Sequence, residues 1–127
     1  MIRERKKLDK IGKYYVNDQL NIDKKLLQYR YQTIKKYFKG NNCLEIGTAE
    51  GLMTKKLVKD FKYLTIIDGS KKLLSNIKNF KNLKKINILI ENYKSNQKFK
   101  TIILDHVLEH VRYPKKTLKK IYNLLDD

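Results

Sequence analysis

The stretch that most constrains the fold of this chain runs from Cys43 to Met53 and reads CLEIGTAEGLM. Its first four residues predict a short buried strand, and the segment from Gly47 to Gly51 predicts a tight turn. A helix is then expected to begin at about Leu52. A glycine turn lets the backbone approach a ligand closely, and a helix N-terminus offers unpaired N–H groups. The stretch therefore predicts a site for a nucleotide-like ligand.

Short apolar strands alternate with helical segments through the rest of the chain. The strands are expected at 43–46, 63–67, 86–90 and 101–104. Helices are expected from residue 23, at 52–59, after residue 70 and from Pro114 onward. Such alternation predicts an α/β fold, in which right-handed crossovers build a parallel sheet with helices on both faces. We therefore expect a Rossmann-like sheet.

Each predicted helix has an apolar stripe that would face the sheet. Ser70 is expected to cap the helix that follows the second strand, and Pro114 suits a first helical turn. The four stripes are Leu27, Tyr31, Ile34 and Phe38; Met53, Leu57 and Phe61; Leu73, Leu74, Ile77 and Phe80; and Leu118, Ile121 and Leu125.

Length and composition predict a single small protein unit. In its 127 residues we expect an N-terminal helical segment at 1–40 and a ligand-binding domain at 41–127. The chain lacks a run of about 18 apolar residues, so no membrane span is predicted. Cys43 is the only cysteine, which excludes an intrachain disulfide and fits a reducing cytoplasm.

The formal net charge of +17 raises the question of a nucleic-acid partner. Of the 30 basic residues, however, 26 are lysine, whereas specific nucleic-acid sites favour the forked donors of arginine. The charge is also spread along the whole chain. Specific nucleic-acid binding is therefore disfavoured, although a basic surface for an acidic partner or RNA stays open as an alternative.

Polar residues follow each predicted strand, where ligands bind in parallel sheets. Asp68 stands at the tip of the second strand, and a carboxylate there can accept hydrogen bonds from ribose hydroxyls. The first turn matches neither a dinucleotide fingerprint nor a Walker A loop. Glu50 inside the turn would also repel a pyrophosphate. These features favour a ligand that has a ribose and no phosphate.

Three segments resemble motifs of the class I S-adenosylmethionine-dependent methyltransferases. They are LEIGTAEG at 44–51, LTIIDGS at 64–70 and the fourth-strand block at 99–111, which ends in LEHV. The resemblance covers residues 41–125 and implies a Rossmann-like methyltransferase that uses S-adenosylmethionine. The family fold has seven strands, so its last strands are expected to be missing here. The fourth strand would then be an open edge, covered by self-association or by a partner chain.

The resemblance also implies roles for individual residues. Motif I would surround the methionine end of the cofactor, the acidic second motif would hold the ribose, and the third-strand loop would meet the adenine. The fourth strand would form the floor under the methyl group. The implied cofactor-binding residues are Glu45, Gly47, Thr48, Ala49, Gly51, Asp68, Gly69, Glu91, Asn92, Leu104 and Asp105. Ala49 replaces a family glycine, which the turn accepts if the φ angle of Ala49 is negative.

His106 and His110 are the only histidines and the candidate catalytic residues. Three interpretations stay open. In the first, one histidine acts as a general base for the acceptor. In the second, both histidines join Glu109 in a metal site on one helical face. In the third, Glu109 and His110 only stabilise the turn after the strand. No metal is included in the prediction for the site.

The predicted function is methyl transfer to an unidentified small-molecule acceptor. Orientation and desolvation supply much of the rate of such an in-line displacement. Tyr14, Tyr15 and Tyr31 either line the acceptor pocket or pack the N-terminal helix. The alternative function is a non-catalytic binding module with a basic surface.

Overall fold

A parallel four-stranded sheet forms the centre of the computed structural model, which describes residues 4–10 and 21–127. All three strand pairs are parallel, which confirms the predicted α/β class. The spatial order is β3-β2-β1-β4. The strands are β1 (Asn42–Ile46), β2 (Tyr63–Asp68), β3 (Leu83–Asn87) and β4 (Thr101–Leu104).

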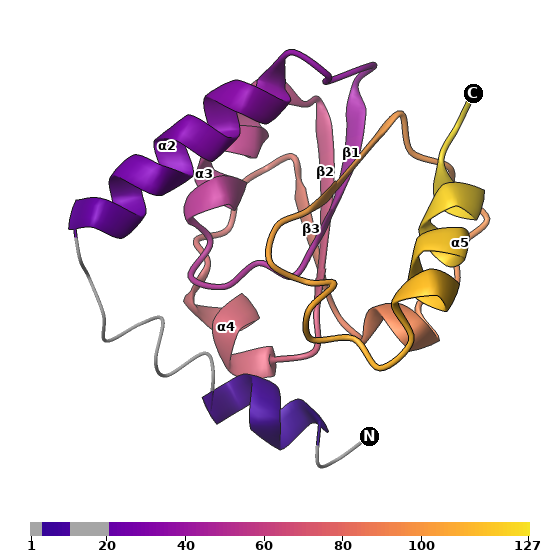
Figure 1. Ribbon diagram of the computed structural model, residues 1–127. Helices are drawn as coiled ribbons and strands as arrows, with labels where there is room; N and C mark the ends of the chain where they lie inside the picture. The colour runs from indigo at the N-terminus through magenta and orange to yellow at the C-terminus, as the bar shows by residue number, and fades with distance from the viewer. Residues whose placement is uncertain (1–3, 11–20) are drawn as a thin grey trace.

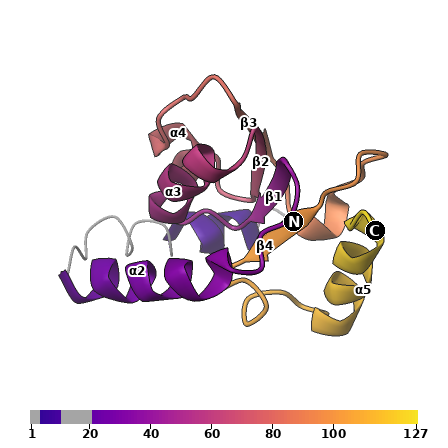
Figure 2. The same ribbon diagram turned by 90° about the horizontal axis from the view of Figure 1, so that it is seen from above.

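Helices cover both faces of this sheet (Figures 1 and 2). One layer contains α2 (Asn21–Lys35), α3 (Leu52–Asp60) and α4 (Lys71–Asn76). The opposite layer contains α5 (Pro114–Leu124), and the short 3-10 helix η1 (Ile90–Asn92) follows β3. Residues 4–10 form a further helix, which lies beside α4 in Figure 1.

Two apolar cores hold these layers together, one on each face of the sheet. The first joins α2, α3 and α4 to the sheet through residues that include Leu27, Leu57 and Ile66. The second joins α5 to the other face through residues that include Leu44, Ile67 and Ile121. Alternate strand residues thus point into different cores, as they must in a sheet that is covered on both sides.

The central strand β1 is buried as predicted. Cys43 and Leu44 are fully inaccessible to solvent, and burial raises the pKa of the Cys43 thiol above its usual range. Cys43 is therefore a small core residue rather than a nucleophile. The register aligns Ile46 with Ile67 of β2 and Leu104 of β4, so the loops after these strands meet at one edge.

The sequence prediction for the third strand was displaced by three residues. The strand occupies Leu83–Asn87, whereas 86–90 was expected. The lysines obscured the pattern: Lys84 is exposed, and the long stem of Lys85 carries its ammonium to the carbonyl of Leu74 at 3.1 Å. The apolar residues at 88–90 instead leave the strand and enter the loop that leads into η1.

Two predicted helical stripes also need correction. Helix α4 ends at Asn76, so Ile77 and Phe80 both lie beyond it, although Ile77 still packs in the first core. In α5 the face toward the sheet consists of Thr117, Ile121 and Leu124, whereas Leu118 and Leu125 are exposed. Ile121 was predicted correctly, but its two inward neighbours each lie one position earlier than predicted. One reason is that threonine was not counted as an inward residue.

Strand β4 is an edge of the sheet in the described part of the chain. It pairs with β1 alone, as the sequence led us to expect. Among residues 4–10 and 21–127, no helix is long and apolar enough to cross a membrane.

Candidate functional site

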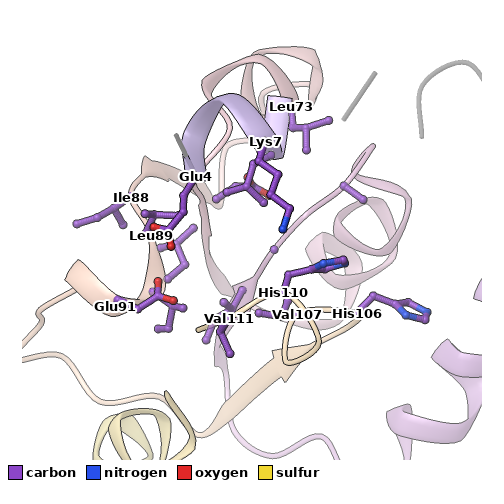
Figure 3. A pocket seen from close by; sticks show the side chains of 18 of the residues that line it. Glu4, Lys7, Leu73, Ile88, Leu89, Glu91, His106, Val107, His110 and Val111 are labelled. Carbon is purple, nitrogen blue, oxygen red and sulfur yellow. The ribbon is translucent and has the colours of Figure 1, made fainter. Parts of the chain in front are cut away.

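A cavity opens at the carboxyl ends of the strands, where parallel sheets bind ligands (Figure 3). Its floor comes from the ends of β1 and β2, and one wall comes from the loop between β3 and η1. The loop after β4 forms the other wall, and helix 4–10 closes the top. The lining residues are Glu4, Lys7, Leu8, Ile46, Gly47, Ala49, Ile67, Asp68, Gly69, Leu73, Ile88, Leu89, Ile90, Glu91, Asp105, His106, Val107, His110 and Val111.

The lining of this cavity is acidic, although the chain as a whole is strongly basic. Among the described residues, four carboxylates line it, from Glu4, Asp68, Glu91 and Asp105, against the single ammonium group of Lys7. The whole chain, by contrast, has 30 basic and 13 acidic residues. Such a lining attracts cations and repels phosphate groups. Glu50, which we expected to repel a pyrophosphate, is absent from the cavity lining, and these four carboxylates supply the repulsion instead.

Asp68 joins the first turn to the loop after β2. Its Oδ2 accepts hydrogen bonds from the backbone N–H of Thr48 at 2.8 Å and from the Thr48 hydroxyl at 3.2 Å. Its Oδ1 accepts from the backbone N–H of Ser70 at 2.7 Å. Ser70 in turn caps α4 by accepting from the N–H of Leu73, which confirms the predicted N-cap. One carboxylate thus fixes two loops of the cavity.

Glu45 is buried behind the turn and is absent from the cavity lining. Its Oε2 accepts a hydrogen bond from the Thr54 hydroxyl at 2.6 Å. Burial is the main cause that raises the pKa of the Glu45 carboxyl to about 8, and the negative charges of Asp105 and Asp68 raise it further. Glu45 therefore holds a proton at neutral pH in the folded chain.

The turn itself uses the left-handed backbone region three times. Gly47 has a φ of 74° and Gly51 a φ of 80°, which glycine adopts without steric cost. Ala49 has a φ of 45°, so the expectation of a negative φ at this position was wrong. The turn keeps the conformation of a glycine-rich loop, and the alanine side chain is strained within it.

Replacing Ala49 with glycine is therefore expected to stabilise the chain. Relief of the left-handed strain, less the extra backbone entropy of glycine, should raise the free energy of unfolding by about 0.5–1 kcal/mol. Urea denaturation measures the change. Ala49→Val is the matched control and should lower stability, because a β-branched residue tolerates this φ even less. A loss of stability in Ala49→Gly would contradict the explanation.

The block after β4 forms a turn rather than the helix that a metal site on one helical face would need. His106 has a φ of 56°, a value that is rare outside glycine, and residues 108–110 form a turn. The Nδ1 of His106 lies 3.0 Å from Oε1 of Glu109, and this contact contributes to a lowered Glu109 pKa behind the larger effect of the backbone N–H of Glu109. Within the ranges that the structure describes, no three histidine, cysteine or carboxylate side chains could hold a metal ion together.

The structure brings several predicted site residues together at the cavity and leaves others outside its lining. Gly47, Ala49, Asp68, Gly69, Glu91, Asp105, His106 and His110 line the cavity. Glu45, Thr48, Gly51, Asn92 and Leu104 do not line it, and their binding roles stay predictions. Thr48 contributes through its hydrogen bonds to Asp68.

Sequence reasoning missed the contribution of residues 4–10. Glu4, Lys7 and Leu8 line the cavity, and Figure 3 shows Glu4 and Lys7 on the opposite side from Val107 and Val111. The hydroxyl of Ser70 donates a hydrogen bond to Asp9, which attaches this helix to the loop after β2. The charged N-terminal sequence has no clear apolar period, so nothing in it predicted this position.

The tyrosines suggested for an acceptor pocket are only partly described. Tyr14 and Tyr15 lie outside the described residues. Tyr31 packs edge-on against Phe38, with their ring centroids 6.3 Å apart, and its hydroxyl donates a hydrogen bond to Asp60 at the end of α3. For Tyr31 the packing interpretation is therefore confirmed.

Comparison with known proteins places this fold among methyltransferases. The chain matches the N-methyltransferase NodS from Bradyrhizobium japonicum with a TM-score of 0.77 and 20% identity, over 86% of this chain and 59% of that one. It matches the plantazolicin methyltransferase BpumL with a TM-score of 0.68 and 22% identity, over 93% and 48% of the two chains. It matches coclaurine N-methyltransferase with a TM-score of 0.71 and 17% identity, over 87% of this chain and 35% of that one.

The chain thus spans between about half and two-thirds of the length of the first solved structures that it matches. These likenesses confirm the predicted Rossmann-like fold. No curated protein matches the sequence. The model of a family described as a methyltransferase domain matches residues 19–127, which is most of the sequence. The chain belongs to this methyltransferase domain family.

Proposed function

We propose that this chain binds S-adenosylmethionine in the cavity at the strand ends and transfers its methyl group to a small-molecule acceptor. The observation that carries the proposal is the acidic cavity in an otherwise basic protein. S-adenosylmethionine has a sulfonium and an ammonium group and no phosphate, so it matches this lining. The matched NodS and BpumL structures are complexes with S-adenosylhomocysteine, which supports the same ligand class.

The lining residues supply a role for each part of the cofactor. Asp68 would accept hydrogen bonds from the ribose hydroxyls, and Gly69 follows it in the cavity lining. Glu91 lies in the loop that would meet the adenine, and the apolar residues 88–90 next to it suit a flat ring. Gly47 and Ala49 bring the backbone of the turn toward the methionine end, and Asp105 would lie nearest the methyl group.

His106 is our candidate for the general base. In the neutral tautomer with the proton on Nδ1, His106 donates a hydrogen bond from Nδ1 to Oε1 of Glu109. The lone pair of Nε2 is then available to accept a proton. As the acceptor oxygen or nitrogen forms its bond to the methyl carbon, the carbon–sulfur bond breaks and sulfur keeps the electron pair. Nε2 of His106 takes the proton that the acceptor loses. His110 also lines the cavity and is the second candidate.

Isothermal titration calorimetry with S-adenosylmethionine and S-adenosylhomocysteine tests the proposal. We expect one site per chain for both compounds, with micromolar affinity typical of enzyme ligands. ATP is the matched control, because it shares the adenosine group but has the phosphates that the acidic lining should reject. No heat of binding at high micromolar ligand, or equal affinity for ATP, would contradict the proposal.

The second candidate function is a binding module for an acidic partner or RNA. A groove along α5 favours it, because Arg112, Lys116, Lys119 and Lys120 line it beside Tyr113. The binding of single-stranded RNA to the intact chain, measured between 50 and 200 mM salt, separates the two functions. A steep salt dependence without affinity for S-adenosylmethionine would favour the module.

A further inference from the structure

We propose that the methyl acceptor binds in a second hollow, at the carboxyl end of β4 and beside α2, and that it is a small molecule with an aromatic body. This inference rests on the proposed function and adds the site and the chemical class of the acceptor. The hollow is part of a groove between α2 and β4. The groove lining includes Leu26, Tyr29, Arg30, Asp105, His106 and Leu108, and also residues 100–104 along β4.

The groove is continuous with the cofactor cavity. Asp105 and His106 line both the cavity and the groove, so the two spaces meet at these residues. The other lining residues of the groove come mainly from α2, from β4 and from the turn after β4. A ligand in the groove would therefore present its reactive atom at the boundary where the cofactor methyl group is proposed to lie.

Side-chain contacts fix Asp105 and His106 at the boundary between the two spaces. Arg30 of α2 forms an ion pair with Asp105, at 3.2 Å between Nε and Oδ2. Glu109 holds the ring of His106, whose left-handed backbone turns the residue out of the line of the strand. Strained residues that their neighbours hold in place are concentrated at functional sites. The boundary thus offers a positioned base and a fixed carboxylate to an O–H or N–H group.

The α2 wall of the groove presents exposed apolar and aromatic side chains. Leu26 is 49% exposed and Tyr29 is 66% exposed, and both belong to the face of α2 that lines the groove. Met53, which is almost fully buried, contributes to the floor. Exposed apolar and aromatic side chains that line one hollow mark a ligand or partner site. They fit a flat apolar body, whose hydroxyl or amine group would point toward His106.

A binding experiment with 2-naphthol tests this inference, because its fused rings fit such a wall and its hydroxyl is a nucleophile. The fluorescence of the probe is titrated with the full chain saturated with S-adenosylhomocysteine. Leu26→Asp puts a charge on the wall and should raise the dissociation constant of 2-naphthol at least about tenfold. Leu118→Asp is the matched control: Leu118 is 47% exposed but lies on α5, and its variant should change this constant less than about twofold.

The affinity for S-adenosylhomocysteine distinguishes a failure of the proposed function from a failure of the acceptor site. Wild-type chain that fails to bind S-adenosylhomocysteine overturns the proposed function itself. Suppose that S-adenosylhomocysteine binds to wild type, Leu26→Asp and Leu118→Asp. The acceptor site is then overturned if 2-naphthol does not bind to wild type, or if it binds to Leu26→Asp as tightly as to wild type. A wild-type dimer that Leu26→Asp converts to a monomer would show that a second copy occupies the groove, which also overturns the inference.

Discussion

The substitution Asp68→Ala is expected to raise the dissociation constant for S-adenosylhomocysteine at least about 100-fold. The proposed ribose contact would lose two hydrogen bonds to a charged acceptor, each worth about 1.5–3 kcal/mol. The turn would also lose its anchor, since the Asp68 carboxylate accepts from the backbone N–H groups of Thr48 and Ser70. Calorimetry on the purified variant measures the affinity.

The same variant should also be less stable, by about 2–4 kcal/mol, because two buried N–H groups lose their acceptor. Thr48→Val is the matched control. It removes only the 3.2 Å hydroxyl bond to Asp68 and leaves the backbone bond in place. Its affinity should stay within about fivefold of wild type, a change of roughly 1 kcal/mol. Unchanged ligand affinity in a folded Asp68→Ala chain would contradict the ribose role.

Stability is expected to fall as the pH rises through the neutral range, and Glu45 is the reason. The unfolded chain has an ordinary Glu45 pKa, near 4.3, whereas burial raises the pKa in the folded chain to about 8. The folded state therefore binds the proton more tightly, so protonation of Glu45 stabilises the fold. This contribution to the free energy of unfolding is fully present below about pH 4. It is lost between about pH 4 and 8, by an amount on the order of 5 kcal/mol at about 1.4 kcal/mol per unit.

Urea denaturation between pH 5 and 9 measures this slope. Glu45→Gln should flatten it, because the amide keeps an acceptor for the Thr54 hydroxyl and has no proton to lose. At pH 8 and above, the variant should be at least as stable as wild type. Glu91→Gln is the control, since Glu91 is exposed at the rim of the cavity and should leave the slope in place. A slope that survives in Glu45→Gln would exclude Glu45 as its source.

The sequence predicted those parts of the fold in which one local pattern determines one structure. Strand β1, its turn and α3 were identified because an apolar run, two glycines and a helical stripe follow one another. The third strand was misplaced because two lysines interrupt its apolar pattern: Lys84 is exposed, and Lys85 contributes its stem rather than an apolar group. An analysis of apolar periodicity counts every lysine as polar, even one whose stem covers apolar surface.

The candidate site was predictable where residues follow the strands in sequence, as Asp68 and Asp105 do. Their position follows from the topology alone, because parallel strands end at one edge. The conformations of Ala49 and His106 were not predictable, since both have a positive φ that their residue types disfavour. Surrounding structure imposes such conformations, so single-sequence patterns give no signal for them.

The helix at residues 4–10 has a consequence for how this cavity can evolve. Glu4 and Lys7 contribute charge to the cavity lining, yet both are exposed and neither belongs to the two apolar cores. Substitutions there can invert the local charge without creating a void or burying an unpaired group, so selection for stability constrains them little. Ligand preference can therefore drift at the N-terminus while the sheet and its turn stay under strict structural constraint.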